Sequence, residues 1–289
     1  MKRQFVFELI MVFVFLPSIL LAQQSNFQFS PPPIPWFEFE EGQKDLKVGG
    51  TLLYLKGKAR DDDPAPPDMG GDIDVYGGGA SVFYRYGLRE RVAIDIGGSI
   101  VYASGDIGKP IDMTLGIYSF PVDLEIQPIK TDKIAVILFG GFNFTWMSVG
   151  IDYDDGTDRV KLDMSATIRG PQFGAQVAFK FPEFVLTPFF MITRLSGNAD
   201  LDVSDDTGPP ASISINIPAS TAYFYGVDLV YLPWNITLSS LIQQISSSGQ
   251  NNGLRTYVLT VSYRFQFDKP EDPAGGGAGK DDRQSPVRG

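Results

Sequence analysis

The chain has 289 residues, of which 43% are hydrophobic and 20% charged, and its formal net charge is −10. It contains no cysteine, which excludes disulfides, thiolate metal sites and an acylated cysteine anchor. It also contains no histidine, which excludes a histidine base and a histidine metal ligand, and the acidic balance argues against nucleic acid as a partner. We therefore expect no cofactor and no metal centre.

Residues 1–22 have the pattern of a signal peptide. Lys2 and Arg3 precede an apolar run from Phe5 to Leu16, and Ala22 is the expected cleavage position. An uncleaved anchor is the alternative, although the run is short for a helix that needs ~20 residues to cross a bilayer. No later apolar run reaches that length, so the pattern predicts export and excludes a helical membrane protein.

Residues 23–45 read as a linker that leads into the folded domain. The stretch SPPPIPWF is dense in proline, and FEFEEGQKD after it is acidic. Consecutive prolines favour extended polyproline geometry, so we expect a semi-rigid spacer.

Strand-like runs then follow one another, and long connections alternate with short ones. The runs are Leu46–Lys58, Ile73–Tyr86, Arg91–Ser104, Asp112–Gln127, Lys133–Val149, Val160–Lys180, Phe184–Leu195, Ser220–Leu232, Ile236–Ser246 and Leu254–Phe267. Most exceed the ~9–11 residues that a tilted strand needs to cross a bilayer, so several should project beyond it.

The last run, LRTYVLTVSYRFQF, carries the clearest pattern. Its odd positions are apolar and mostly aromatic near the end, whereas its even positions are largely polar. Together with the alternating connections, this predicts an all-β fold, a closed antiparallel up-and-down transmembrane β-barrel over residues 46–267. The count is about ten strands, with eight or twelve as alternatives, and a soluble β-sandwich is the competing fold. The tail, residues 268–289, should be disordered.

One run changes phase inside the predicted barrel. In residues 160–180 the apolar positions are even up to Ile168 and odd from Phe173 onward, with Gly170-Pro171 between them. A β-bulge at this point would restore the register, and we expect one there.

Charged residues in mid-strand should face the lumen, because an arginine facing lipid near the midplane costs roughly 2–4 kcal/mol. The predicted lumen charge network consists of Arg85, Asp95, Asp123, Glu125, Arg169, Arg194, Asp228 and Arg264. Glycines such as Gly49, Gly97, Gly141 and Gly174 share its phase and leave space, which long arginine side chains or water would fill. A largely filled lumen is the favoured interpretation, and a small charge-lined pore is the alternative.

The connections on the side of the long loops are acidic. Asp61–Asp63, Asp152–Asp158 and Asp200–Asp206 are examples. DYDDG has some features of a calcium loop, but its glycine comes too early and no glutamate follows at the required distance. Solvated turns are the simpler interpretation, and cation bridging to lipopolysaccharide phosphates is a hypothesis.

With its signal segment, its strand pattern and its terminal SYRFQF, the chain resembles the small outer-membrane β-barrel proteins of Gram-negative bacteria, a class that includes the outer-membrane protein A and W types. The resemblance implies an outer-membrane location, with the N- and C-terminal segments in the periplasm. It also implies contacts with outer-membrane lipid and lipopolysaccharide, and recognition of the C-terminal strand by the barrel assembly machinery.

The enzymes of this class, as families, use an active-site histidine, so their activities do not transfer to a chain that has none. The sequence thus predicts a non-enzymatic barrel with a structural or surface-interaction role. The alternative is a small, porin-like channel or carrier for polar or apolar solutes.

Overall fold

The computed structural model describes residues 39–58, 72–106, 111–154, 156, 159–205, 210–246 and 255–267. The predicted signal peptide, most of the predicted linker, the tail and several acidic loop residues lie outside this part of the chain. Among the described residues, no helix is long and apolar enough to cross a membrane.

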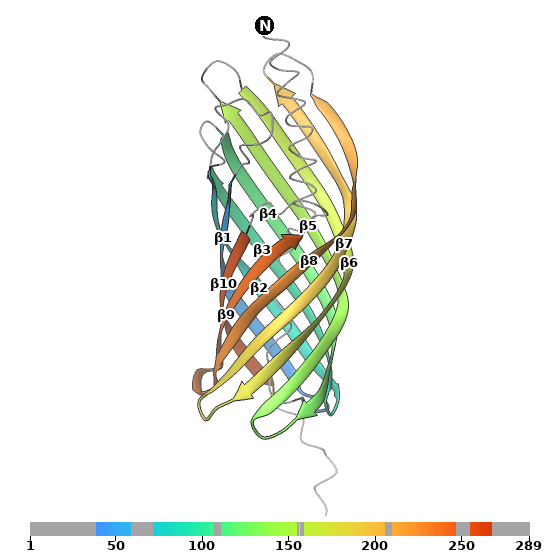
Figure 1. Ribbon diagram of the computed structural model, residues 1–289, viewed down its shortest axis with the longest axis vertical. Helices are drawn as coiled ribbons and strands as arrows, with labels where there is room; N and C mark the ends of the chain where they lie inside the picture. The colour runs from blue at the N-terminus through green and yellow to red at the C-terminus, as the bar shows by residue number, and fades with distance from the viewer. Residues whose placement is uncertain are drawn as a thin grey trace, which may run out of the picture.

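Ten strands form a single closed ring in which each pairs with its neighbours in the chain and β1 pairs with β10 (Figure 1). They are β1 Lys44–Lys58, β2 Asp72–Arg89, β3 Val92–Asp106, β4 Ile111–Lys130, β5 Ile134–Asp154, β6 Arg159–Lys180, β7 Phe184–Asp205, β8 Ala211–Tyr231, β9 Ile236–Ser246 and β10 Arg255–Phe267. All pairs are antiparallel, and β1 closes on β10 from Lys44 opposite Phe267 to Lys56 opposite Arg255. The predicted up-and-down barrel of about ten strands is confirmed.

The two ends of the barrel differ. At one end, here called the turn end, β2–β3, β4–β5, β6–β7 and β8–β9 are joined by short turns, and β1 starts and β10 finishes. At the other, the loop end, the longer connections lie. Strands β4 to β8 have 20 to 22 residues, whereas the other five have 11 to 18, so one side of the barrel rises further toward the loop end (Figure 1).

The outer face carries an apolar belt next to the turn end. Large hydrophobic side chains are exposed there, among them Leu124, Leu138, Phe173 and Leu259. Aromatic side chains border the belt: Tyr86, Phe181, Phe184, Trp234 and Phe267 at the turn end, and Tyr54, Tyr76, Tyr102, Trp146, Tyr223 and Tyr257 on the loop side. An apolar band between two aromatic girdles is the outer surface that a lipid bilayer requires of a barrel.

Beyond the belt the outer face becomes polar, and β6 shows the change within one strand. From Phe173 to Phe179 its outward side chains are apolar, whereas from Arg159 to Arg169 they are charged or hydroxylic and the apolar ones point inward. The register of β6 with β5 runs without interruption from Phe179 to Arg159. The predicted bulge at Gly170-Pro171 is therefore wrong. The phase changes because the strand leaves the apolar belt at this point. Within the belt the apolar residues face outward, and beyond it they face inward.

Strands β7 and β8 continue through most of the region predicted as a long loop. Their extensions pair from Gly197 opposite Ile217 to Val203 opposite Ala211, after a register shift at Leu195–Gly197. The segment contains many Asp, Ser and Asn residues, which are typical of loops, but here they occupy the water-facing side of strands beyond the belt.

The chain before β1 packs against the barrel instead of leading away from it. Phe39 is 2% exposed and lies in a cluster with Ala93 and Ile137. The Gly42 N–H donates to the carbonyl oxygen of Gly87 at 2.8 Å, and the Gly87 N–H donates to that of Gln43 at 2.9 Å. The predicted linker thus ends earlier than Asp45, because the segment from residue 39 closes part of the turn end.

Candidate functional site

The interior of the barrel has two chemically distinct parts. Toward the turn end it is lined by charged and amide side chains, a group we call the polar base. Its charged members, all buried, are Asp45, Lys47, Arg85, Asp95, Asp123, Glu125, Asp228 and Arg264. Its buried amide side chains are Gln43, Gln127, Asn143, Gln172 and Gln176.

Asp45 is the centre of this base. Its Oδ2 accepts hydrogen bonds from Arg85 Nε at 3.2 Å and from an Arg85 terminal nitrogen at 2.7 Å, and Arg264 donates in the same two-pronged way to Oδ1. The Gln43 amide also donates to Asp45, at 3.0 Å. Because Asp45 lies directly opposite Arg85 in the β1–β2 ladder, the strand register itself places this ion pair.

Arg85 joins the ion pair to the rest of the base. Its other terminal nitrogen lies 3.5 Å from Glu125 Oε2, and its guanidinium carbon lies 4.7 Å from the centre of the Phe39 ring. The segment before β1 and the lumen charges therefore form one packed unit.

A second group of acids crosses β3 and β4. Asp95 and Asp123 are directly opposite in the ladder, and Asp123 Oδ2 accepts a hydrogen bond from the Gln172 amide at 2.6 Å. Gln172 reaches across β5 because the residue between them is Gly141, where a Cβ would lie 2.4 Å from Asp123. On the opposite wall Lys47 interacts electrostatically with Asp228.

The structure places six of the eight residues predicted for the lumen charge network inside the barrel: Arg85, Asp95, Asp123, Glu125, Asp228 and Arg264. It places Arg169 and Arg194 on the outer face, so their assignment to the lumen is wrong. The rule that a strand arginine must avoid lipid holds only within the belt, and both residues lie just beyond it.

Asp45, Lys47 and Phe39 were missed. The two charged residues share the phase of Gly49, which the sequence already indicated as inward, so extending the alternation back by four residues would have found them. No comparable signal marks Phe39, because its burial depends on a return of the chain against the barrel.

Aromatic rings occupy the space beside the inward glycines. A Cβ on Gly97 would lie 2.1 Å from the Phe83 ring, and a Cβ on Gly174 would lie 2.2 Å from the Phe139 ring. Gly226 is in the same way covered by Phe189. Rings rather than arginine side chains or water therefore fill these gaps, and they separate the polar base from the part of the interior above it.

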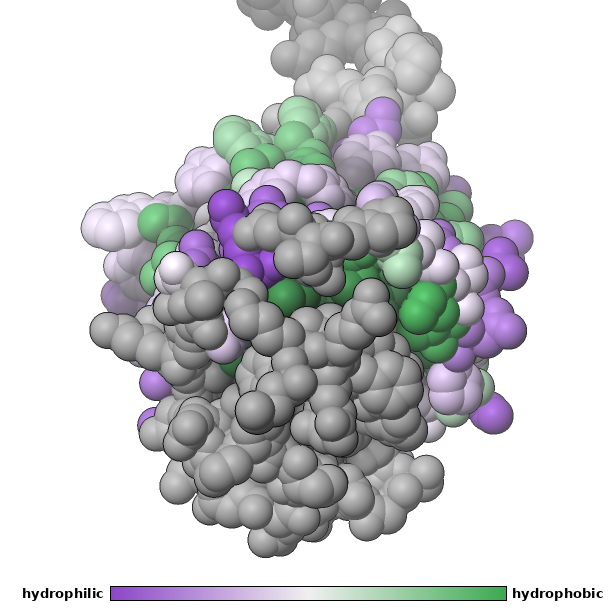
Figure 2. All heavy atoms as spheres, turned by 90° about the horizontal axis from the view of Figure 1, so that it is seen from above, coloured by the Kyte–Doolittle hydropathy of each residue, from purple (hydrophilic) through white to green (hydrophobic). Residues whose placement is uncertain are grey.

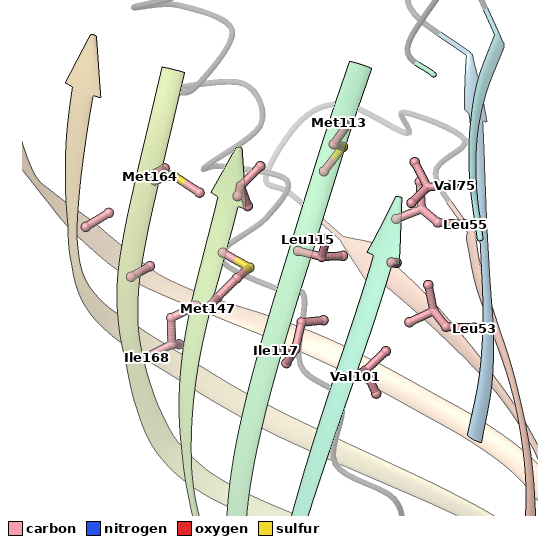
Figure 3. Packing of buried hydrophobic residues seen from close by; sticks show 14 of the residues in the cluster. Leu53, Leu55, Val75, Val101, Met113, Leu115, Ile117, Met147, Met164 and Ile168 are labelled. Carbon is pink, nitrogen blue, oxygen red and sulfur yellow. The ribbon is translucent and has the colours of Figure 1, made fainter. Parts of the chain in front are cut away.

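Toward the loop end the lining is apolar, and all ten strands contribute to it. Figure 3 shows its side chains projecting into the space that the strands enclose, among them Leu53, Val101, Leu115, Met147 and Ile168. The four methionines of the described residues all belong to this apolar lining: Met113, Met147, Met164 and Met191. Viewed from the loop end, some hydrophobic residues are visible near the middle of the molecule, and both hydrophobic and hydrophilic residues lie around its edge (Figure 2).

The part of the chain that the structure describes contains no group of three or more acidic side chains placed to hold a metal ion. In the DYDDG segment, Asp152 is bound by Arg159, with nitrogen–oxygen distances of 3.0 and 2.5 Å. This hydrogen bonding keeps the pKa of the Asp152 carboxyl below its ordinary value. Asp155 and Asp158 lie outside the described residues.

No protein-family model matches the sequence, and no curated protein sequence is detectably similar to it. The fold is similar to that of the outer membrane protease OmpT from Escherichia coli, at a TM-score of 0.51 and 10% identity over 78% of this chain and 97% of that one. Lower scores are found for the translocator domain of the autotransporter NalP from Neisseria meningitidis and a major outer membrane protein from Thermus thermophilus. Their TM-scores are 0.43 and 0.40, each at 13% identity, over 76% of this chain and 88% and 99% of theirs.

These observations define the class of the protein. A closed ten-stranded antiparallel barrel, with an apolar belt outside and a charged base inside, has the fold of the bacterial outer-membrane β-barrel proteins.

Proposed function

We propose that this protein is a non-enzymatic barrel of the bacterial outer membrane that binds small apolar molecules in the part of its interior nearest the loop end. The observation that carries the proposal is the apolar lining, to which all ten strands contribute. Of the two functions that the sequence predicts, a carrier fits this lining better than a purely structural barrel with a charged lumen.

Small inward residues and flexible ones alternate in this lining. Ala166 of β6 lies directly opposite Ala199 of β7 and Met147 of β5, and all three are buried. Unbranched, polarisable methionine side chains adapt to ligands of different shape, and alanines leave room beside them. Binding sites for small molecules are mostly lined by apolar side chains such as these.

The proposed orientation has the loop end outside the cell and both described chain ends in the periplasm. It is supported by the short turns at the end where β1 starts and β10 finishes, and by the polar outer face that β4 to β8 extend beyond the loop-side girdle. In this orientation the apolar lining lies toward the cell exterior.

The polar base supports binding without free ion flow. The ion pairs of Asp45 with Arg85 and Arg264, the amides and Phe39 lie at the turn end, so an apolar solute would have to displace buried ion pairs to pass straight through. Since the chain has no histidine, we extend neither the protease activity of the similar fold nor any other histidine-dependent catalysis to it.

The proposal is tested with an uncharged naphthalene-type fluorescent probe titrated into the protein in lipid nanodiscs, with empty nanodiscs as the reference. We expect saturable binding, and a loss of roughly tenfold or more in affinity when Ala166→Phe fills the lining. The matched control Ser165→Phe changes the adjacent residue, which points outward, and should bind as the unsubstituted protein does. Absence of saturable binding contradicts the proposal.

A conductance measurement in planar bilayers tests the closed base. We expect no defined unitary current steps at neutral pH. Regular steps would show an open pore and favour a porin-like channel over a carrier.

A further inference from the structure

Arg169 and Arg194 stand together on the outer face of β6 and β7. Arg169 is directly opposite Ser196, two residues along β7 from Arg194, and Arg194 is opposite Thr221 of β8. Such diagonal neighbours have Cα atoms about 7–8 Å apart, so two arginine side chains can reach one group between them.

Among the residues that the structure describes, neither guanidinium has a hydrogen-bond or ion-pair partner, in contrast to Arg159 further along β6, which binds Asp152. The outward neighbours of the pair include the hydroxyl groups of Thr167, Ser196 and Thr221, and also Phe144 of β5, which lies directly opposite Arg169. The next acids on these two strands toward the loop end are Asp163 and Asp200, several residues further along. The pair is thus a local excess of positive charge, with hydroxyl groups on one side and an aromatic ring on the other.

The pair lies at the loop-side edge of the apolar belt. The next outward residues toward the turn end are Pro171 on β6 and Ile192 on β7, and Phe173 of the apolar belt follows Pro171. Trp146, opposite Thr167, and Tyr223, opposite Ile192, flank the pair and belong to the loop-side aromatic girdle. Aromatic girdles mark the level of lipid headgroups, so both guanidinium groups lie where the phosphates of a bilayer lie.

We propose that Arg169 and Arg194 bind the phosphate of a membrane-lipid headgroup, and in the proposed orientation that of a phosphorylated glycolipid in the outer leaflet. The planar guanidinium group matches phosphate with two parallel hydrogen bonds, and a pair of them surrounds one phosphate from two sides. The inference rests on the proposed membrane location but not on the binding of apolar molecules inside the barrel.

The test uses the full chain in detergent, titrated with a bis-phosphorylated diglucosamine lipid, with the same lipid after removal of its phosphates, and with inorganic phosphate. The lipids bound to each protein molecule are counted by native mass spectrometry. Arg169→Gln and Arg194→Gln should each weaken binding of the phosphorylated lipid by roughly tenfold, and the double variant by more. The dephosphorylated lipid should bind weakly to all forms.

The matched control is the double variant Arg159→Gln/Lys161→Gln, which removes the same charge from the same face of β6 about 27 Å or more away along the strand. It should bind the phosphorylated lipid as tightly as the unchanged protein. Equal losses in both double variants would show a non-specific charge effect and overturn the site. Displacement of the lipid by millimolar inorganic phosphate would overturn the assignment to a lipid headgroup.

Heat-modifiable migration in gels confirms that each variant has formed the barrel before it is titrated. Because both arginines are exposed, their substitution should leave this migration unchanged. Unchanged lipid binding by the folded Arg169→Gln/Arg194→Gln variant overturns the inference, while the apolar-probe titration decides the proposed function separately.

Discussion

Asp45 is the carboxylate that two buried arginine side chains share. Arg85, Arg264 and Asp45 are each no more than 2% exposed, and the carboxylate receives both guanidinium groups. Removing such charges from water costs free energy, and the attraction between the ion-pair partners mainly offsets that cost. The arrangement stabilises the barrel only as long as all its members are present.

Asp45→Asn should therefore destabilise the barrel by about 3–5 kcal/mol, because two buried guanidinium groups lose the carboxylate that they share. Unfolding in urea from lipid vesicles, followed by tryptophan fluorescence, measures the change. Asp112→Asn removes an exposed carboxylate from β4 and should change the unfolding free energy by less than about 0.5 kcal/mol. Equal effects would show that the ion pairs of the base are dispensable.

Gly97→Ala should destabilise the barrel by about 1–3 kcal/mol, because its Cβ would collide with the buried Phe83 ring. Gly98→Ala is the control, since nothing lies within 4 Å of a Cβ at that position. If the ring is the cause, the double variant Gly97→Ala/Phe83→Leu should lose less stability than the two single changes together. Strict additivity in the same urea experiment would contradict this packing.

At the scale of the strand, β6 exchanges its apolar face at Arg169–Pro171 without any change of register. Toward the turn end its outward side chains must suit lipid and its inward ones the polar base. Beyond the belt the outer face meets water, and the inward face must supply an apolar core. The outer face of one continuous strand thus meets lipid along one part of its length and water along the other.

Substitutions on the outward face of β6 should show this boundary. Phe173→Arg places a charge in the apolar belt and should cost up to roughly 2–4 kcal/mol, depending on its depth. Ser165→Arg lies on the same face beyond the belt and should be tolerated within about 0.5 kcal/mol. Similar losses at both positions would mean that the belt extends over the whole strand.

The pairing of Asp152 with Arg159 ties the ends of β5 and β6 together and depends on pH. Because hydrogen bonds from Arg159 lower the pKa of Asp152 below its ordinary 3.8, the interaction stabilises the folded state above that pH and is lost as the pH falls through the lowered value. Carboxyl NMR titration should place the Asp152 midpoint below 3.8, and Arg159→Gln should move it upward. An unchanged midpoint in the variant would show that the pairing does not form.

The strand number and the lumen position of six charged residues follow from period-two alternation and loop lengths, because both are local properties of the sequence. Arg169 and Arg194 were misplaced because alternation gives the face of a residue relative to its neighbours, and not where the membrane ends. The extensions of β7 and β8 were missed because Asp, Ser and Asn on a water-facing strand look like a loop. The packing of Phe39 is a contact between distant segments, which no local pattern encodes.

At the scale of the whole molecule, the interior and the exterior change polarity at about the same level, in opposite senses. Next to the turn end the barrel is apolar outside and charged inside, whereas toward the loop end it is polar outside and apolar inside. The charged base lies toward the turn end, and the apolar lining beyond the belt is where we propose that apolar molecules bind. The level at which the bilayer ends is therefore the central claim, since the proposed carrier and the proposed lipid site both depend on it.

The most direct test of that level is a depth measurement along β6. The chain has no native cysteine, so single cysteines at outward positions can be labelled with a fluorophore in lipid vesicles. The positions are Asp163, Ser165, Thr167, Phe173, Ala175 and Val177. We predict that labels at the first three are quenched by a water-soluble quencher, and labels at the last three by a quencher attached to the lipid chains. Lipid-chain quenching at the first three, or aqueous quenching at all six, would contradict the account.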